Sequence, residues 1–302
     1  MAVNCPFCSN ATELAFSSED RNRRLGSEVF HYYKCISCGL VFIENPPDDI
    51  ASYYKGGYQE LPSSLEMLRC MAAPERHRLE FVLRYKTKGK LLEIGPWIGL
   101  FSVNAKDAGF DVTCFESSQE CVDLLNVMAG IRAFQTNDPA ESLRTLDETF
   151  DVIALWHSLE HLPHPWDVMK LASLRLAPGG ILIVAIPNID SYQSVKMRED
   201  WFHLDAPRHM YFWGPKSLSK LATSYGLHTS LLTTRDQLSR DLSYQAIIQD
   251  VRKNKPVGAN RSLIWKLVTR AQAELRFQCG RILHDKEGRG AGITAVFNKA
   301  DI

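Results

Sequence analysis

Short apolar runs and segments of helical periodicity alternate from Lys90 to the end of the chain. This alternation is typical of parallel strands joined by crossover helices, and Pro178-Gly179-Gly180 predicts a sharp turn before one of the strands. Apolar residues at helical spacing predict helices near 63–85, 100–108, 119–128, 166–176 and 215–225. The seven predicted strands are LLEIG, DVTCFE, RAFQT, FDVIALW, GILIVAIP, HTSLLTT and GITAVFNK.

The N-terminal part carries two paired cysteine motifs, Cys5-Pro6-Phe7-Cys8 and Cys35-Ile36-Ser37-Cys38. Each pair can present two thiolates from one tight turn, and four thiolates complete the tetrahedral shell that structural zinc prefers. A module of about 40 residues is too small to hold a core unaided, so the metal would supply folding energy. We therefore predict a structural Zn²⁺ bound by Cys5, Cys8, Cys35 and Cys38, with no open position for a substrate.

Breaks in the pattern predict the domain boundaries. Pro46-Pro47 ends a zinc-binding module at 1–46, and a linker with an N-terminal helical arm fills 47–89. The strand and helix alternation then occupies 90–302, interrupted at about 237–289 by a stretch longer than a hairpin connection. Helical periodicity in this insertion predicts a cap or a homodimer surface.

The segment LLEIGPWIGLF reads as a buried strand, a glycine turn and a helix. Glu93, Gly95 and Gly99 mark the strand end and the turn, and Glu116 closes the next strand. A carboxylate at that place can accept hydrogen bonds from the hydroxyls of a ribose. Because Trp97 replaces a glycine where backbone amides would cradle a pyrophosphate, a phosphate-free nucleoside cofactor fits better than a dinucleotide.

From about Leu91 to Lys299 the chain resembles the class I S-adenosylmethionine-dependent methyltransferases, whose first motif runs acid, x, Gly, x, Gly, x, Gly. Glu93, Gly95 and Gly99 match that motif, and Trp97 departs from it at the middle glycine. The resemblance implies an α/β fold: a Rossmann-like seven-stranded methyltransferase sheet with an inserted, antiparallel last strand, here beside a small N-terminal zinc ribbon. FDVIALWHSLEHLPHP, LAPGGILIVAIPN and HLDAPRHMYFWGPKSL look like a bacterial branch that tailors saccharides and secondary metabolites.

The resemblance also implies the cofactor, S-adenosyl-L-methionine, and its site. Asn137 or Asp138 would bind the adenine amino group, although Asp138 before Pro139 also fits an ordinary turn. The end of the FDVIALW strand would lie near the sulfonium. The residues assigned to the cofactor are Glu93, Gly95, Trp97, Gly99, Glu116, Ser117, Asn137, Asp138 and Trp156.

His157, Glu160 and His161 follow that strand at spacing i, i+3 and i+4, so a helix beginning there would project all three from one face. RNA 2'-O-methyltransferases and ubiquinone-pathway O-methyltransferases bind a divalent ion through a similar run, and His209 resembles a further histidine of the RNA enzymes. Three interpretations stay open: His209 or His161 as general base, a second divalent metal at the cluster, or a purely structural role.

The stretch Trp201–Trp213 is too aromatic for an exposed linker and is expected to line the acceptor pocket. Arg208 could bind a phosphate or carboxylate of the acceptor through two hydrogen bonds. The alternative is an internal ion pair between Arg208 and Asp205 that braces the loop.

Composition limits the classes of molecule that the protein is expected to bind. The 302 residues carry 35 basic and 35 acidic side chains, and this neutrality argues against nucleic acid or an anionic membrane as partner. The chain shows neither a signal-peptide pattern nor a run of about 18 apolar residues, so we expect a cytoplasmic location. The sequence thus predicts a methyltransferase acting on oxygen, or else carbon or nitrogen, of a small-molecule or saccharide-like acceptor. The competing hypothesis is a zinc-ribbon nucleic-acid-binding protein whose methyltransferase-like domain modifies RNA or is inactive.

Overall fold

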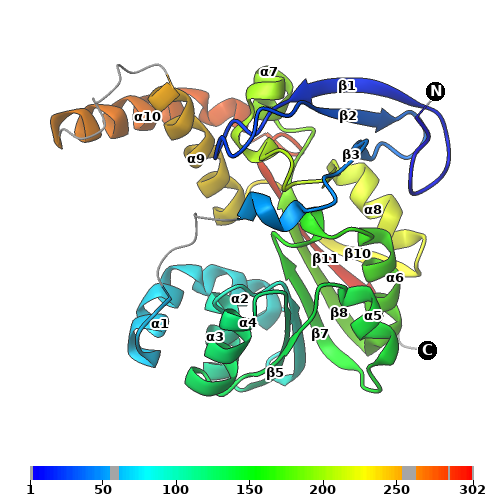
Figure 1. The fold of residues 1–302 in the computed structure, drawn as a ribbon. Coiled ribbons are helices and arrows are strands. Elements are labelled where there is room, and N and C mark those ends of the chain that lie inside the picture. Colours follow the sequence, from blue (N-terminus) through cyan, green and yellow to red (C-terminus); the bar gives the residue numbers. More distant parts are fainter. Residues whose placement is uncertain (1–2, 55–60, 254–262, 285, 301–302) are drawn as a thin grey trace. The chain divides into compact units, whose positions relative to one another are not determined.

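The structure is a computed structural model that describes residues 3–54, 61–253, 263–284 and 286–300 (Figure 1). The chain divides into two compact units, each assembled from separate stretches, whereas the sequence suggested contiguous domains. The ribbon unit comprises 1–57, 186–218 and 233–294, and the sheet unit comprises 58–185, 219–232 and 295–302.

All seven predicted strands are present in one sheet with the order β10-β11-β8-β7-β4-β5-β6. The last strand, β11, lies between β8 and β10, as the resemblance implied. Strand β4 pairs in parallel with β5 on one side and β7 on the other, so the chain order reverses there and creates a switch point. The strands are β4 (Gly89–Ile94), β5 (Phe110–Glu116), β6 (Arg132–Gln135), β7 (Phe150–Trp156), β8 (Leu176–Pro187), β10 (Leu227–Thr233) and β11 (Gly292–Lys299).

The middle of the sheet is buried on both faces. Successive side chains in 152–156 of β7 and 181–186 of β8 point to opposite faces, yet all of them are buried. This explains why both strands read as continuous apolar runs instead of alternating patterns. The carboxyl ends of both strands therefore follow directly on deeply buried residues.

The helices of the sheet unit follow the predictions with two differences. The predicted helix at 63–85 is broken by a 3₁₀ turn around Pro74, because proline lacks the amide hydrogen that a continuous helix needs. The helix α5 was not predicted from the sequence. The helical elements are α1 (Leu65–Ala72), η2 (Ala73–Glu75), α2 (Arg76–Leu83), α3 (Leu100–Asp107), α4 (Gln119–Asp123) with the π-turn η3 (Leu124–Met128), α5 (Pro139–Thr145), η4 (Leu159–His161), α6 (Pro165–Arg175) and, largely in this unit, α8 (Pro215–Thr223).

The ribbon unit holds a four-stranded sheet with the order β1-β2-β3-β9. The first three strands come from the N-terminal module, and the fourth comes from the aromatic stretch more than 160 residues later. Helices α9 and α10 pack against each other in the same unit (Figure 1). Among the described residues, no helix is long and apolar enough to cross a membrane. The elements are β1 (Thr12–Ser18), β2 (Phe30–Cys35), β3 (Val41–Ile43), η1 (Ile50–Tyr54), α7 (Tyr192–Met197), η5 (Arg198–Asp200), η6 (Phe202–Leu204), β9 (Tyr211–Phe212), α9 (Gln237–Lys253) and α10 (Leu263–His284).

Candidate functional site

The four predicted metal ligands converge in the ribbon unit. One ligand atom from each of Cys5, Cys8, Cys35 and Cys38 lies within 4.8 Å of all the others. The sulfur atoms of Cys5 and Cys38 are 3.7 Å apart, and those of Cys8 and Cys35 are 3.5 Å apart. Four sulfurs at about 2.3 Å from a tetrahedral ion stand roughly 3.8 Å from one another, whereas a disulfide needs about 2 Å.

The two cysteine turns share one hydrogen-bonding pattern. The Ser9 amide donates to the Cys5 carbonyl at 2.8 Å, and the Gly39 amide donates to the Cys35 carbonyl at 3.1 Å. The sulfurs of Cys8 and Cys35 also accept N–H donors, from the Asn10 amide group at 3.3 Å and the Cys38 backbone at 3.4 Å. N–H donors of this kind stabilise thiolate charge, so the donor set fits a four-cysteine zinc ion.

The aromatic stretch is attached to the ribbon through its backbone. Strand β9 pairs antiparallel with β3, and the Ile43 amide donates to the Met210 carbonyl at 2.9 Å. The buried Tyr32 hydroxyl of β2 donates to the His209 carbonyl at 3.0 Å. The neighbouring peptide groups of His209 and Met210 are therefore both held by the N-terminal module.

Arg208 forms the deepest polar contact between these segments. Its side chain is 1% exposed and donates to the carboxylates of Asp20 and Asp205, with closest distances of 2.7 Å to each. A further bond of 3.1 Å reaches the Tyr53 carbonyl. The ion pair of Arg208 with Asp205 that the sequence left as an alternative is thus present, and Asp20 joins it. Nothing in the sequence around Asp20 had singled it out.

Electrostatics agree with the geometry of this triad. Burial opposes ionisation of Asp20 and Asp205, but hydrogen bonds from Arg208 outweigh it, so the pKa of each carboxyl lies below its usual range. Burial also works against the charge on Arg208, yet its two carboxylate partners raise its pKa. The guanidinium has its donors committed inside the unit, so it is a bracing group instead of an exposed anion clamp.

His209 is half-buried in the same loop. Its Nδ1 lies 2.8 Å from the His203 carbonyl oxygen, which assigns the Nδ1 proton as the donor. His203 in turn lies with Nε2 2.7 Å from the Leu242 carbonyl on α9. The imidazole of His209 is therefore fixed in one orientation by a backbone oxygen. Its predicted catalytic or metal-binding role stays a prediction.

In the sheet unit, the glycine turn between β4 and α3 requires both of its glycines. Gly95 and Gly99 have φ of +74° and +79°. A Cβ on Gly95 would stand 2.6 Å from the Ser158 Cβ, and one on Gly99 would stand 2.3 Å from a Leu125 methyl carbon. Trp97, at the middle glycine of the family motif, also has a positive φ of 54°. The backbone thus keeps the shape that the motif specifies although one glycine is replaced.

Glu116 lies beside this turn at the end of β5. Its Oε1 accepts the amides of Ser117 and Ser118 and the Ser117 hydroxyl, while its Oε2 accepts the Trp97 amide at 2.8 Å. Only one bond to Oε2 is present within the described residues, and a carboxylate oxygen can accept a second. The carboxylate is thus aimed at the turn with acceptor capacity on one oxygen, which suits a ribose hydroxyl.

Glu93, the acid of the family motif, is buried beneath the glycine turn. It is 2% exposed, and the Ser102 hydroxyl donates to its carboxylate. Burial is the main cause that raises the pKa of Glu93 to about 7. The acid of the family motif is therefore a buried group whose pKa is raised, and its contact with Ser102 was not predicted from the sequence.

The remaining cofactor candidates differ in their surroundings. Asp138 caps α5, since its Oδ1 accepts the amides of Ala140 and Glu141 at 2.9 and 3.2 Å. Asn137 is exposed, and its side chain makes no hydrogen bond within the described residues, which leaves it the better candidate for adenine. Trp156 is buried against Phe101, with ring centroids 5.4 Å apart.

The segment after β7 does not form the helix on which the shared face of His157, Glu160 and His161 depended. His157 has φ of +55°, and only the single turn η4 follows it. Glu160 is nevertheless fully buried, with its Oε1 3.4 Å from Nδ1 of His157 and a carboxylate oxygen within 4.8 Å of a His161 ring nitrogen. The two imidazoles therefore flank one buried carboxylate.

Ser158 joins this segment to the glycine turn. Its hydroxyl donates to the Ile94 carbonyl at 2.7 Å, and its Cβ occupies the space that a side chain on residue 95 would need. His157 and Glu160 thus lie next to the turn at the carboxyl ends of β4 and β7, where open α/β sheets bind their ligands. No sequence motif had marked Ser158.

A family model described as a methyltransferase domain matches residues 66–230, more than half of the chain. The chain belongs to this methyltransferase family. The prediction of a Rossmann-like, S-adenosylmethionine-dependent methyltransferase is confirmed.

Individual relatives are distant. The methyltransferase is 26% identical over 185 residues to a ubiquinone biosynthesis O-methyltransferase of Coxiella burnetii, covering 55% of this chain and 79% of the relative. It is 28% identical over 186 residues to a protein of the same name from Psychrobacter cryohalolentis, covering 53% and 71%. A solved S-adenosylmethionine-dependent methyltransferase of Archaeoglobus fulgidus has a TM-score of 0.51 at 18% identity, over 76% of this chain and 94% of that one. This last likeness concerns the fold.

Proposed function

We propose that this methyltransferase transfers a methyl group to a hydroxyl oxygen of a small-molecule or saccharide-like acceptor. The names of its distant relatives support oxygen as the acceptor atom. The observation that carries the proposal is the pair formed by His157 and buried Glu160, because a histidine oriented by a carboxylate is suited to taking a proton from a hydroxyl.

The cofactor fits the residues present in the sheet unit. Gly95 and Gly99 lie where a Cβ atom would collide with Ser158 or Leu125, so the backbone of the turn stays free of side chains there. Oε2 of Glu116 can accept a further hydrogen bond from a ribose hydroxyl. Ser117 and the Trp97 amide fix that carboxylate, and Asn137 is available for the adenine edge. When bound, S-adenosylmethionine supplies an electrophilic methyl group.

Residues at the end of β7 would orient the acceptor and remove the proton of its hydroxyl group. Nδ1 of His157 faces Glu160, and Nε2 of His157 is buried without a hydrogen-bond partner within the described residues. A buried ring nitrogen without a partner is costly unless a ligand satisfies it. We assign Nε2 as the acceptor of the hydroxyl proton, while Glu160 stabilises the resulting imidazolium. From the sequence, His209 or His161 was the candidate base in one of three open interpretations.

Turnover assays with a panel of phenols and saccharides, measuring release of S-adenosylhomocysteine, test this assignment. His157→Gln should slow turnover about 100-fold or more while leaving binding of S-adenosylhomocysteine unchanged. His228→Gln, which alters an exposed histidine on β10, is the matched control. If His161→Gln slows the reaction and His157→Gln does not, the base is His161 and our assignment fails.

The metal-assisted alternative rests on Glu160 and His161, whose ligand atoms lie within 4.8 Å of each other. An ion bound there would lower the pKa of an acceptor hydroxyl. Metal analysis decides between the two mechanisms. A second ion per chain that is lost in His161→Gln would favour metal assistance, and a single zinc that survives this change would favour the histidine base.

We further propose that Cys5, Cys8, Cys35 and Cys38 hold a structural zinc ion whose role is to support the aromatic stretch around His209. The sulfur spacing supports the ion, and the pairing of β3 with β9 supports the role. Purified protein should contain one zinc per chain, and Cys35→Ser should lose it. A full zinc content in Cys35→Ser would contradict the assignment. A cytoplasmic location and a homodimer formed through α9 and α10 also remain proposals.

A further inference from the structure

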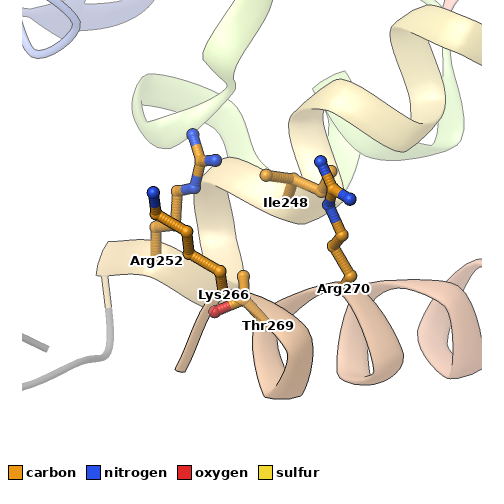
Figure 2. A pocket seen from close by; sticks show the side chains of 5 residues that line it. All are labelled: Ile248, Arg252, Lys266, Thr269 and Arg270. Atoms are coloured by element: carbon orange, nitrogen blue, oxygen red, sulfur yellow. The ribbon is translucent and has the colours of Figure 1, made fainter. Parts of the chain in front are cut away.

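Helices α9 and α10 line a partly open hollow of about 450 Å³ that neither the proposed cofactor site nor the cysteine cluster uses. Ile248 and Arg252 of α9 line one wall, and Lys266, Thr269 and Arg270 of α10 line the other (Figure 2). Residues four apart on a helix share a face, so Ile248 with Arg252 and Lys266 with Arg270 present two stripes to the same space. Three cationic side chains therefore meet at one hollow.

No carboxylate pairs with these cations in the described part of the chain. Within the described residues, no ion pair or hydrogen bond involves the side chain of Arg252, Lys266 or Arg270. The nearest acids in the sequence have other partners: Asp250 accepts from Arg276 at 2.8 Å, and Glu274 accepts from Gln278 at 2.7 Å. Like charges at i and i+4 destabilise a helix, so Lys266 and Arg270 oppose each other until an anion lies between them.

The remaining lining residues set the size and character of the ligand. Ile248 gives the hollow an apolar wall. The Thr269 hydroxyl donates to the Trp265 carbonyl at 2.6 Å, so this hydroxyl is not available as a donor. The volume falls within the range of about 300 to 1,000 Å³ found for small-molecule sites and is far larger than an inorganic phosphate needs.

We propose that the hollow between α9 and α10 binds an organic phosphate, with Arg252, Lys266 and Arg270 around the phosphoryl groups and the organic part against Ile248. Guanidinium groups suit phosphate because their planar N–H donors match two phosphate oxygens at once. This site is independent of the proposed methyl transfer, and its failure would leave that function standing.

Titration calorimetry of the full chain with inorganic pyrophosphate and uridine diphosphate tests the site. Uridine diphosphate is preferred to an adenine nucleotide because it avoids competition for the adenosyl site. We expect the wild-type protein to bind uridine diphosphate at micromolar to sub-millimolar concentrations and to bind inorganic pyrophosphate more weakly. Arg270→Gln should weaken binding of uridine diphosphate about tenfold, since one charge-assisted bond contributes roughly that factor.

Arg276→Gln is the matched control, because it removes the same charge from the same helix while Arg276 points to Asp250. Far-UV circular dichroism and binding of S-adenosylhomocysteine establish that each variant is folded. The proposal is overturned if wild-type protein binds neither probe at millimolar concentration, if Arg276→Gln weakens binding as much as Arg270→Gln, or if S-adenosylhomocysteine displaces uridine diphosphate. Binding that strengthens with the length of an RNA and leaves uridine diphosphate unbound would also overturn it, in favour of a polyanion surface.

Discussion

Replacing Arg208 with methionine should destabilise the ribbon unit strongly. The substitution keeps most of the side-chain volume but removes a guanidinium that is 1% exposed and bonded to two carboxylates. It leaves Asp20, whose side chain is fully buried, as an unpaired charge. Breaking a buried ion pair from one side costs about 3 to 5 kcal/mol, a large part of a typical folding free energy of roughly 5 to 15 kcal/mol.

The effect should depend on pH in a defined direction. In the wild-type protein the lowered pKa of Asp205 contributes stability that is present above the unfolded value of about 3.9 and is lost as the pH falls below it. Without Arg208 the buried carboxyls favour the protonated form. The difference in unfolding free energy between wild type and Arg208→Met should therefore shrink as the pH falls toward about 4.

Urea denaturation of the full chain, followed by circular dichroism at pH 7.5 and pH 5, measures both effects. The control is Arg21→Met, which breaks an exposed ion pair with Asp200 and should cost at most about 1 kcal/mol. Asp20→Asn combined with Arg208→Met should recover part of the loss, because the unpaired buried charge is removed. If Arg208→Met and Arg21→Met shift the transition equally, the buried triad does not brace this unit and our reasoning fails.

The other predictions concern the glycine turn, its two acids and the cysteine cluster. Burial raises the pKa of Glu93 to about 7, so the stability that its neutral form contributes is complete below about pH 4.5 and is lost as the pH rises through 7. Glu93→Gln should therefore remove about 3 kcal/mol from the pH dependence of the unfolding free energy. Wild-type and mutant unfolding free energies that run parallel between pH 5 and 8 would contradict this prediction. Gly95→Ala should lower the melting temperature because of its φ of +74° and the 2.6 Å approach to Ser158, and adding Ser158→Gly should recover only the steric part. Glu116→Ala should weaken binding of S-adenosylhomocysteine about tenfold or more in calorimetry, with Glu120→Ala, an exposed acid of α4, as control. Treatment with a chelator should expose the ribbon unit to limited proteolysis, because the proposed zinc ion would supply folding energy; an unchanged cleavage pattern would count against a structural ion.

The pattern of apolar residues was sufficient to predict most strands and helices of the sheet unit. Strands β7 and β8 are continuous apolar runs, and a short run of this kind is typical of a strand that is buried on both faces of a sheet. The glycine turn was also predictable, since Gly95 and Gly99 adopt backbone conformations that other residues rarely take. The two paired cysteine motifs predicted the cluster because their local turns already place two sulfurs together.

Local spacing failed where the chain leaves regular structure. The run from His157 to His161 looked helical, but His157 turns into the left-handed region and η4 lasts one turn. Asp138 proved to be the cap of α5, the ordinary alternative that its position before a proline had suggested. Arg208 looked like an exposed anion clamp or a local ion pair, and its burial depends on Asp20, which lies far away in the sequence.

The sequence alone determined the fold class, the glycine turn and the two paired cysteine motifs, because each depends on residues close together along the chain. Tertiary structure alone decided which charges are buried, which carboxyl groups have a raised or lowered pKa and which strand completes the ribbon sheet. These properties depend on contacts such as β3 with β9 and Asp20 with Arg208, between segments more than 160 residues apart. Desolvation acts on a group only after such segments have packed around it, so no local pattern can report it.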